Sequence, residues 1–540
     1  MKKQAIFLIV TLAFALLFNI FNSNSYTVAD GNMRCVEVFN ANKPYLHGNN
    51  HMLYPVHIYY FNKLLDRLGI KSKDGFEYFR HSEIMNAMAG AVSLGIIYLI
   101  LSALSGSSFY GILGILCIGF SKSFLECATN PNEAMVGFFF NVVSIWFFYL
   151  SVSRNKTIYS CLSGASFSYA IATYSAMSSG VAVILVYLYN IFAHKDDRLR
   201  YLKMTVFYLI SLFAGLIIIY GISYSIFLHI HTFRDGLNEF FTSYRVEEGV
   251  KKIWGTLKFK NLLLIFYGFV QALFQLPYYE LREAFLGDDR NYRIALALIP
   301  PIILTVALWI VLWNVLLRLL KTGKKYAETV IFLVIFLAYA MFCPLYVQVN
   351  HAKLWPQPIT IFVALSIYLL ANYFRMDIHR HIARRIKIFL LIFLATLMTW
   401  NVFNVLIPNH EGEKERVKLA SDFDKLIGKN SLVFIEWDKV GPIFSIFFKG
   451  QRDVMSVPTM VLTTDRRRLI ERLDSEIEKA KKSNKEIYFV GFLNKSRYKW
   501  NLFFGKLGIS YESFQKYRDH SKLIVSFDST NERYCLYKYE

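Results

Sequence analysis

Asp30 is the first residue whose type and position indicate chemistry. It follows a short polar segment after an apolar run at 5–20 that approaches the length of a membrane span. A carboxylate near a membrane is costly to bury and is often functional, and it can act as a general base. The alternative is a solvated loop aspartate near a helix end.

Other polar residues flank later apolar runs. They combine cationic, acidic and aromatic side chains: His51 and Tyr54 in the segment 51–55, Arg80 before the small-residue stretch 86–90, Glu133 at the end of 127–133, and His351 and Lys353 in 350–356.

Each of these residues also has a purely structural interpretation. Arg80 fits an interfacial side chain that extends toward the headgroups, and Glu133 fits an acid that stabilises a helix N-terminus. His51 fits a helix-entry residue. His351 and Lys353 fit a hydrated loop.

Composition limits the class of protein that positions these residues. The 540 residues are 55% hydrophobic and only 18% charged, with a net charge of +21. So many apolar residues exclude a disordered chain. Six cysteines are too few for a fold of this size to be stabilised mainly by disulfides. Apolar runs of membrane-spanning length argue against a soluble nucleic-acid binder. The remaining class is a polytopic α-helical membrane protein.

The apolar runs predict about eleven membrane spans. The run at 5–20 lacks a signal-peptide cleavage site, so it predicts an uncleaved first span. The others lie near 84–104, 110–123, 134–150, 158–176, 181–192, 206–228, 294–320, 330–342, 359–373 and 388–407.

The short basic loops predict the orientation. With a cytoplasmic N-terminus, alternation of these spans places the loops at 154–156, 194–203, 318–325 and 375–387 inside, as the positive-inside rule requires. This requires the apolar stretch 262–276 to be interfacial or re-entrant. The segments 21–83 and 229–293 and everything after 408 then lie on the outer side. The membrane is expected to be a prokaryotic cytoplasmic (inner) membrane.

The chain changes character near 409. Residues 1–408 form the predicted membrane domain, and 409–540 predict a small extracytoplasmic α/β domain with a docking or acceptor-recognition role. Its predicted strands lie at 432–435, 454–457, 486–490, 523–527 and 534–539, with the last two expected as an antiparallel pair. Its predicted helix covers 465–482, with Thr464 as a possible N-cap. Before span two, apolar residues at helical spacing over 54–68 predict an amphipathic helix, lying on the membrane surface or packed on this domain.

The N-terminal third resembles the C superfamily of multi-span glycosyltransferases, and specifically the family-39, dolichyl-phosphate-mannose–protein mannosyltransferase type. The resemblance rests on Asp30 after span one, the run 51–55, Arg80 opening span two and the run 127–133. In that family a second acid often follows the first. Here that position is Gly31, which leaves Glu37 or Glu133 as substitutes.

The resemblance implies transfer of a sugar from a polyprenyl-phosphate donor to an acceptor hydroxyl, with inversion. Asp30 is then the base, with Glu133 as a second catalytic acid. Arg80, His351 and Lys353 bind the donor phosphate, and His51, Tyr54 and Glu37 contact substrate. No cofactor is required, although the pattern does not exclude a divalent metal.

The implied partners are the lipid-linked donor, a lipid, glycan or protein acceptor, and membrane lipids, with no nucleic acid. Two other functions stay open. A polysaccharide or lipid transporter or flippase predicts duplicated halves and charges in mid-span, and a non-catalytic scaffold would display the C-terminal domain.

Overall fold

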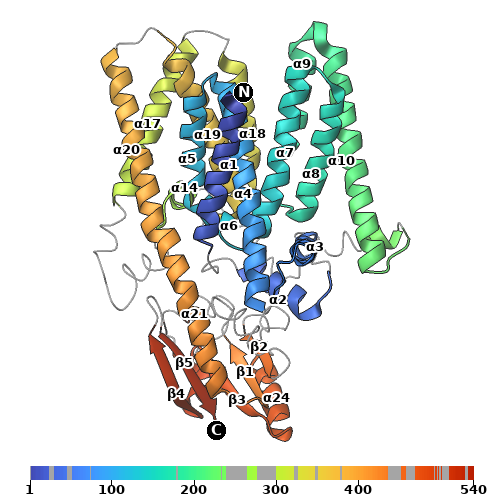
Figure 1. The fold of residues 1–540 in the computed structure, drawn as a ribbon, viewed down its shortest axis with the longest axis vertical. Coiled ribbons are helices and arrows are strands. Elements are labelled where there is room, and N and C mark those ends of the chain that lie inside the picture. The colour runs from blue at the N-terminus through green and yellow to red at the C-terminus, as the bar shows by residue number, and fades with distance from the viewer. Residues whose placement is uncertain are drawn as a thin grey trace.

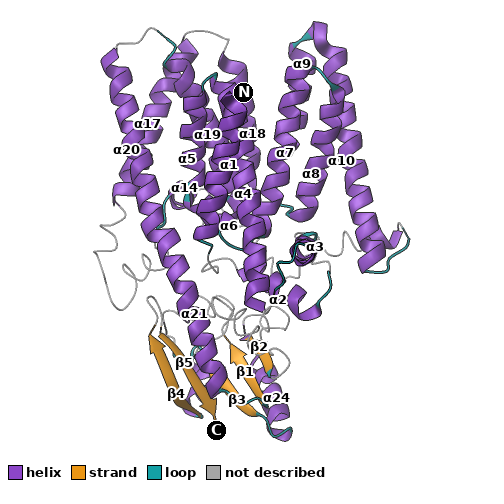
Figure 2. Ribbon diagram, in the orientation of Figure 1, coloured by secondary structure: helices purple, strands orange, loops and turns teal. Residues whose placement is uncertain are grey.

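The computed structural model describes most of the chain. The described residues are 2–22, 29–44, 52–72, 75–177, 180–232, 234–238, 264–276, 299–321, 326–346, 351–376, 380–435, 452–457, 469–491, 493–494, 497, 500, 510–528 and 533–540. Helices dominate, and the described strands all lie near the C-terminus (Figure 2).

The N-terminal helices contain the first candidate residues. They are α1 (Lys2–Ile20), α2 (Ala29–Ala41), α3 (Tyr54–Arg67) and α4 (Gly75–Ser105). Helix α1 packs along α4, where the absence of a side chain at Gly95 admits Thr11 and Phe7. Helices α2 and α3 lie at the end of the bundle that faces the sheet (Figure 1). The prediction of a helix at 54–68 is confirmed, with Ile58 buried and Leu64 exposed.

The rest of the helical bundle follows in chain order. It comprises α5 (Ser108–Gly119), α6 (Lys122–Ala128), α7 (Glu133–Arg154), α8 (Thr157–Thr173), α9 (Val181–Ala193), the short η2 (Lys195–Asp197), α10 (Arg198–Phe227), α14 (Ile265–Leu273), α17 (Ile299–Lys321), α18 (Ala327–Tyr346), the short η4 (Ala352–Leu354), α19 (Pro356–Tyr373) and α20 (Arg380–Asn401).

The lengths of these helices bear on the predicted spans. Within the described residues, 6 helices are long and apolar enough to cross a membrane, or 7 if α5 and α6, bent by 72° at their junction, form one broken span. The chain is therefore a multi-pass membrane protein. Other predicted spans correspond to α8, α9, α18 and α19, which are not both long and apolar enough to be counted among these, so the count of about eleven stays a prediction. Helix α14 has 9 residues, about 14 Å of helix, and is too short to cross.

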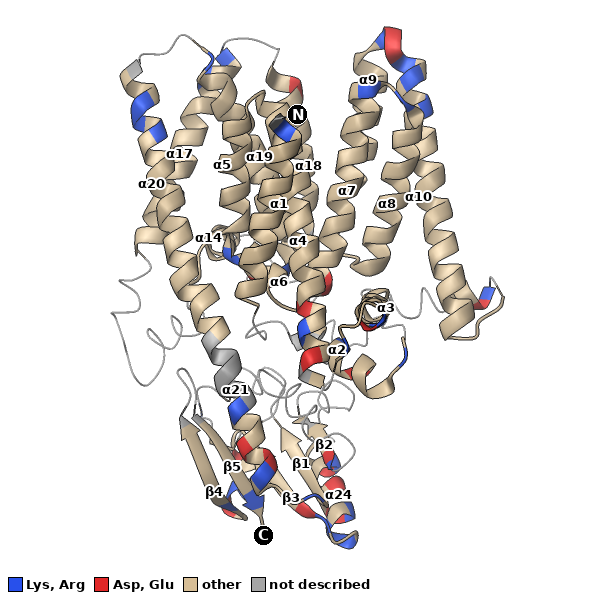
Figure 3. Cartoon of the chain, viewed as in Figure 1, with Lys and Arg blue, Asp and Glu red and all other residues tan. Residues whose placement is uncertain are grey.

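Basic residues gather at one end of the bundle. Figure 3 shows Lys and Arg near the N-terminus, at the α9–α10 connection, at the end of α17 and at the start of α20. The sheet and helices α2 and α3 lie toward the other end. This arrangement agrees with basic loops that share one side of a membrane; which side they face stays a prediction.

The C-terminal sheet has five strands in the order β2-β1-β3-β5-β4. Its members are β1 (Ser431–Ile435), β2 (Asp453–Ser456), β3 (Glu486–Val490), β4 (Ser521–Asp528) and β5 (Arg533–Tyr539). Strands β2, β1 and β3 are parallel, whereas β5 pairs antiparallel with both β3 and β4. All five predicted strands are confirmed, as is the antiparallel final pair. The predicted helix is observed as α24 (Leu469–Lys482); Thr464 and 465–468 lie outside the described residues.

A nearly continuous helix joins the bundle to the sheet (Figure 1). Helix α20 passes through a π-helical segment, η5 (Val402–Leu406), into α21 (Ile407–Leu426). Helix α21 buries Leu419 and Phe423 against one face of the sheet. Helices α24 and α26 (Glu512–Asp519) cover the other face. Arg452, next to β2, donates to the carbonyls of Asp424, Ile427 and Gly428 at 2.9, 2.6 and 3.0 Å, which fixes the end of α21.

Candidate functional site

Asn86 of α4 fixes the segment that leads into α7. Its fully buried side-chain amide donates to the carbonyls of Asn130 at 2.7 Å and Asn132 at 2.8 Å. The Asn132 side chain in turn accepts from the backbone N–H of Ala134 at 2.9 Å, which caps α7. These bonds place Glu133 at the first turn of α7, inside the protein rather than in solvent.

Glu133 pairs with Lys353 across 220 positions of sequence. Lys353 Nζ donates to Glu133 Oε1 at 2.9 Å, and the side chains are only 4% and 1% exposed. Lys353 lies on η4, and its ammonium is also 5.8 Å from the centre of the Tyr174 ring. Two residues predicted separately are thus brought into one buried ion pair.

The Asp30 segment packs beside this ion pair. Asp30 lies in the first turn of α2, but its side chain is outside the described atoms. The next residue, Gly31, lies against the backbone of Pro131 and Asn132, and a β-carbon at position 31 would overlap the Pro131 carbonyl oxygen. This contact leaves no room for an acidic side chain at position 31, and it places the α2 backbone close to Asn132, next to Glu133.

Tyr54 and Cys35 line the same buried region. The Tyr54 hydroxyl donates to Asn86 Oδ1 at 3.4 Å. Burial, together with nearby Cys35, Glu133 and Glu83, raises the pKa of Tyr54 well above its usual range. Burial likewise raises the pKa of the Cys35 thiol, again with Glu83 and Glu133 nearby. Both groups therefore stay protonated and neutral near the carboxylates.

The remaining predicted residues lie around this centre or outside the described chain. Glu37 pairs with Arg34 of the same helix at 2.6 Å and is about two-fifths exposed. Arg80 is exposed on α4. His351 is half-buried directly before η4, where its carbonyl accepts from Leu354 N at 3.1 Å. His51 lies outside the described residues.

Sequence reasoning did not assign a role to three buried charged residues: Glu83 of α4, and Lys122 and Glu126 of α6. They are 1%, 5% and 2% exposed, respectively. A charge within or beside an apolar segment is the signal that could have identified them. Within the described residues, no group of three or more His, Cys, Asp or Glu could hold a metal ion.

An apolar groove of about 520 Å³ lies beside this buried centre. Residues of α3, α4, α7 and α8 line it: Val56, His57, Tyr60, Phe61, Leu64, Met85, Met88, Ala89, Val92, Val136, Phe139, Phe140 and Tyr169. Val136, which lines the groove, is one helical turn from Glu133, so the groove and the ion pair adjoin the same end of α7. His57 is held between aromatic rings, 3.3 Å from Thr173 Oγ1, and burial lowers its pKa to about 4.

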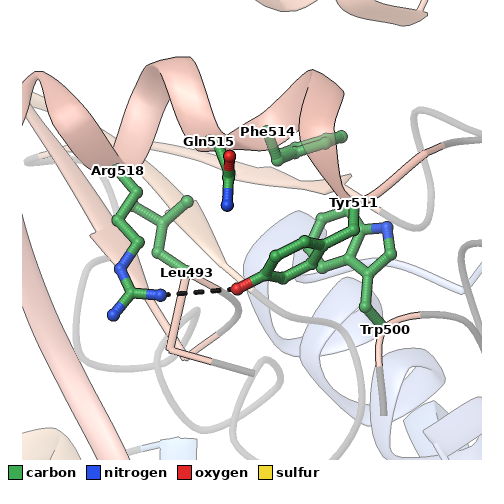
Figure 4. Close-up of a pocket in the computed structure, with 6 residues that line it drawn as sticks. All are labelled: Leu493, Trp500, Tyr511, Phe514, Gln515 and Arg518. Atoms are coloured by element: carbon green, nitrogen blue, oxygen red, sulfur yellow. Dashed lines mark hydrogen bonds between the residues drawn. The ribbon is translucent and has the colours of Figure 1, made fainter. Parts of the chain in front are cut away.

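A second hollow lies beside α26 in the C-terminal domain (Figure 4). Aromatic, aliphatic and polar side chains line it: Leu493, Trp500, Tyr511, Phe514, Gln515 and Arg518, with Arg518 donating to the Tyr511 hydroxyl at 3.4 Å. Its volume of about 10 Å³ leaves room for about one water molecule. It is too small for a sugar.

The fold has known counterparts. No family model matches the chain, and no curated protein matches its sequence. The crystal structure of ArnT from Cupriavidus metallidurans bound to undecaprenyl phosphate aligns with a TM-score of 0.55 at 9% identity, over 98% of this chain and 97% of that chain. Apo ArnT from the same organism aligns over the same shares with a TM-score of 0.37 at 11% identity. The alignment with the lipid-bound structure shows that the chain shares the fold of ArnT.

Proposed function

We propose that this chain transfers a sugar from a polyprenyl-phosphate donor to an acceptor hydroxyl. The observation that carries the proposal is the buried Glu133–Lys353 pair at the start of α7, a helix that also lines an apolar groove, in a chain whose fold is similar to that of ArnT. A lipid-linked donor needs both features, because its tail is apolar and its reacting end is charged. The family-39 type remains the proposed relationship.

The groove is the proposed site of the polyprenyl tail. Its walls are almost entirely hydrocarbon and aromatic, which suits a prenyl chain. Its one titratable imidazole, His57, is neutral near pH 7 because burial holds its pKa at about 4. The undecaprenyl phosphate bound to ArnT is a lipid of the same chemical class.

Arg80 and the η4 residues are the proposed phosphate ligands. Arg80, Ile84 and Met88 share one stripe of α4, and Met88 lines the groove. The Arg80 backbone therefore lies about 12 Å along the helix axis from Met88. Arg80 offers paired N–H groups to phosphate oxygens, while Lys353 and His351 approach from η4. These cations would supply charge stabilisation as the phosphate leaves.

Asp30 is the proposed base. Its carboxylate takes the proton of the acceptor hydroxyl while the hydroxyl oxygen bonds to the anomeric carbon. The bond between that carbon and the phosphate oxygen breaks, and the phosphate keeps the electron pair. A single displacement inverts the anomeric centre. Support comes from the packing of Gly31 on Pro131, which places Asp30 on the helix beside Glu133.

The other predicted residues take supporting roles in this proposal. Tyr54 is fully buried and holds the Asn86 amide that orients the segment before Glu133. Glu133 fixes Lys353 near the phosphate. His51 and Glu37 remain proposed contacts to substrate. In this proposal the site lies at the outer face of a cytoplasmic membrane, the C-terminal domain lies on the same side, and the acceptor is a lipid, glycan or protein.

The test uses the purified full-length chain in nanodiscs with a panel of radiolabelled polyprenyl-phosphate sugars and an envelope extract as acceptor. We expect transfer from one donor, and its loss in Asp30→Asn at normal expression and melting temperature. Asp197→Asn, an exposed aspartate in η2, is the matched control and should keep full activity. Full activity of Asp30→Asn would contradict the proposed base, and an inactive wild-type chain with every donor would contradict the proposed function.

A further inference from the structure

A second buried ion pair lies on α6, directly after the bend from α5. Lys122 Nζ is 3.7 Å from Glu126 Oε1, and the side chains are 6% and 3% exposed. Charges buried within a membrane bundle are costly and are retained where they serve a role. The proposed transfer assigns neither residue a role.

This pair lies close to the Glu133–Lys353 pair. Helix α6 packs against η4, which contains Lys353, and η4 also packs against α7, which begins at Glu133. The Cys127 thiol lies within electrostatic range of Glu126, Glu133 and Lys353. Asn132, next to Glu133, donates its side-chain amide to that same sulfur at 3.4 Å. The two pairs therefore form one buried charged layer, with Cys127 between them.

The arrangement of these charges means that Lys122 affects how strongly Glu126 attracts Lys353. The Lys353 ammonium pairs with Glu133, and η4, which contains Lys353, packs against α6, which contains Glu126. Opposite charges attract strongly in a poorly hydrated interior, so Glu126 competes for the same ammonium. Lys122 is the ammonium on the helix of Glu126, one turn away. Its charge offsets that of Glu126 and so weakens the attraction between Glu126 and Lys353.

We infer that Lys122 is a positioning residue that neutralises Glu126 and thereby keeps Lys353 paired with Glu133. The inference rests on the proposed function, because it assigns Lys122 an effect on the proposed site without contact with substrate. Replacement of Lys122 by a neutral residue would draw Lys353 toward Glu126. The Glu133 carboxylate would then lose its ammonium, and protonation of Glu133 would become easier.

The experiment compares Lys122→Met, Glu126→Gln and the double variant in the full-length chain, with the donor that the wild-type chain uses. We expect Lys122→Met to lower kcat/KM on the order of tenfold, as slight misplacement of a catalytic group does, and to shift the acidic limb of its pH profile to higher pH. The double variant lacks both charges and should recover to within about threefold of wild type. Lys122→Arg keeps the charge and should also retain activity and the wild-type pH profile.

Two results would overturn the inference. One is a double variant whose kcat/KM is as low as that of Lys122→Met, and the other is a Lys122→Met chain with the wild-type rate and pH profile. If Lys122→Met does not fold, the inference is tested by adding it to Glu126→Gln: a folded, active double variant supports the charge argument, and an unfolded or inactive one refutes it. A wild-type chain that is inactive with all donors is a failure of the proposed function, and it is distinguished from these outcomes before any variant is made.

Discussion

The side-chain amide of Asn401 donates to the carbonyl of Phe120 at 2.7 Å, although 281 positions separate the two residues. Phe120 lies at the bend between α5 and α6. The same amide nitrogen donates to Leu273 O at 2.6 Å, and its oxygen accepts from Gln275 N at 3.0 Å. Asn401 thus joins the α5–α6 bend, the end of α14 and the start of the π-helical segment.

Substitution Asn401→Leu should lower the free energy of unfolding by about 2–5 kcal/mol, because each buried polar group left without a partner costs about 1–3 kcal/mol. Denaturant titration of the detergent-solubilised chain measures the change. The control is Asn404→Leu, because Asn404 is exposed and its side chain donates to Trp400 O. Equal effects of both substitutions would refute the special role of Asn401.

Removal of one partner of the Glu133–Lys353 pair should be worse for stability than removal of both. Lys353→Met leaves a buried carboxylate without its ammonium and should cost about 3–5 kcal/mol. The double variant Lys353→Met, Glu133→Gln should regain most of that loss yet remain inactive in transfer. Thermal melts and transfer assays of the single and double variants check this. A double variant as unstable as Lys353→Met would show that packing, rather than charge, explains the loss.

Gly31→Ala should reduce transfer by at least about tenfold, because the added methyl group must push α2 away from Pro131 and so displace Asp30. Gly221→Ala is the matched control, since a β-carbon at that helical position meets no atom within 4 Å. Measurement of kcat/KM for the two variants tests whether the Gly31 contact positions Asp30. Wild-type activity in Gly31→Ala would mean that this contact does not position the base.

Ala89→Trp should fill part of the apolar groove and raise the KM for a long-chain donor about tenfold, with less effect on a donor that has a short, water-soluble prenyl tail. Ile210→Trp on the exposed face of α10 is the control, because Ile210 is 59% exposed. Steady-state kinetics with the two donors separates tail binding from a general loss of activity. An equal rise in KM for both donors would argue against a tail site.

The stability of the chain should fall as the pH drops from about 6.5 to about 4, partly because of His57. Burial lowers its pKa to about 4 in the folded chain, whereas its unfolded pKa is about 6.5. The unfolded state therefore binds a proton first, and protons favour unfolding in this window. His57→Phe should show a smaller loss of melting temperature between pH 7 and pH 4.5. An identical pH dependence in both chains would contradict this cause.

The sequence predicted the sheet better than the bundle. Alternating and continuous apolar runs bounded by charged segments identified all five strands, and Glu486–Val490 matched residue for residue. The bend at Phe120–Ser121 could not be predicted, because it interrupts an apolar run without a proline and depends on Asn401. Residue 408, where the predicted membrane domain ends, lies in the first turn of α21, where the missing N–H of Pro408 is tolerated.

Local sequence identified some candidate residues but not the contacts between them. Local sequence singled out Glu133 and Lys353, because charges beside apolar runs are conspicuous. Their mutual contact depends on the packing of η4 against α7, which local sequence does not encode. Lys122 and Glu126 drew no prediction, although Lys122 lies within the predicted span 110–123 and Glu126 lies just after it.

Because α20 continues through η5 into α21 as a nearly continuous helix, the length of this helix sets how the C-terminal sheet is rotated relative to the bundle. From Asn401 to Leu426 the path is about 37 Å, and each residue advances the helix by about 1.5 Å and turns it by about 100°. One inserted residue would therefore swing the sheet to face a different direction while barely lifting it. An insertion of seven residues would raise the sheet by about 10 Å and nearly restore its original heading. The number of residues in this helix consequently sets the direction in which each face of the sheet points relative to the bundle.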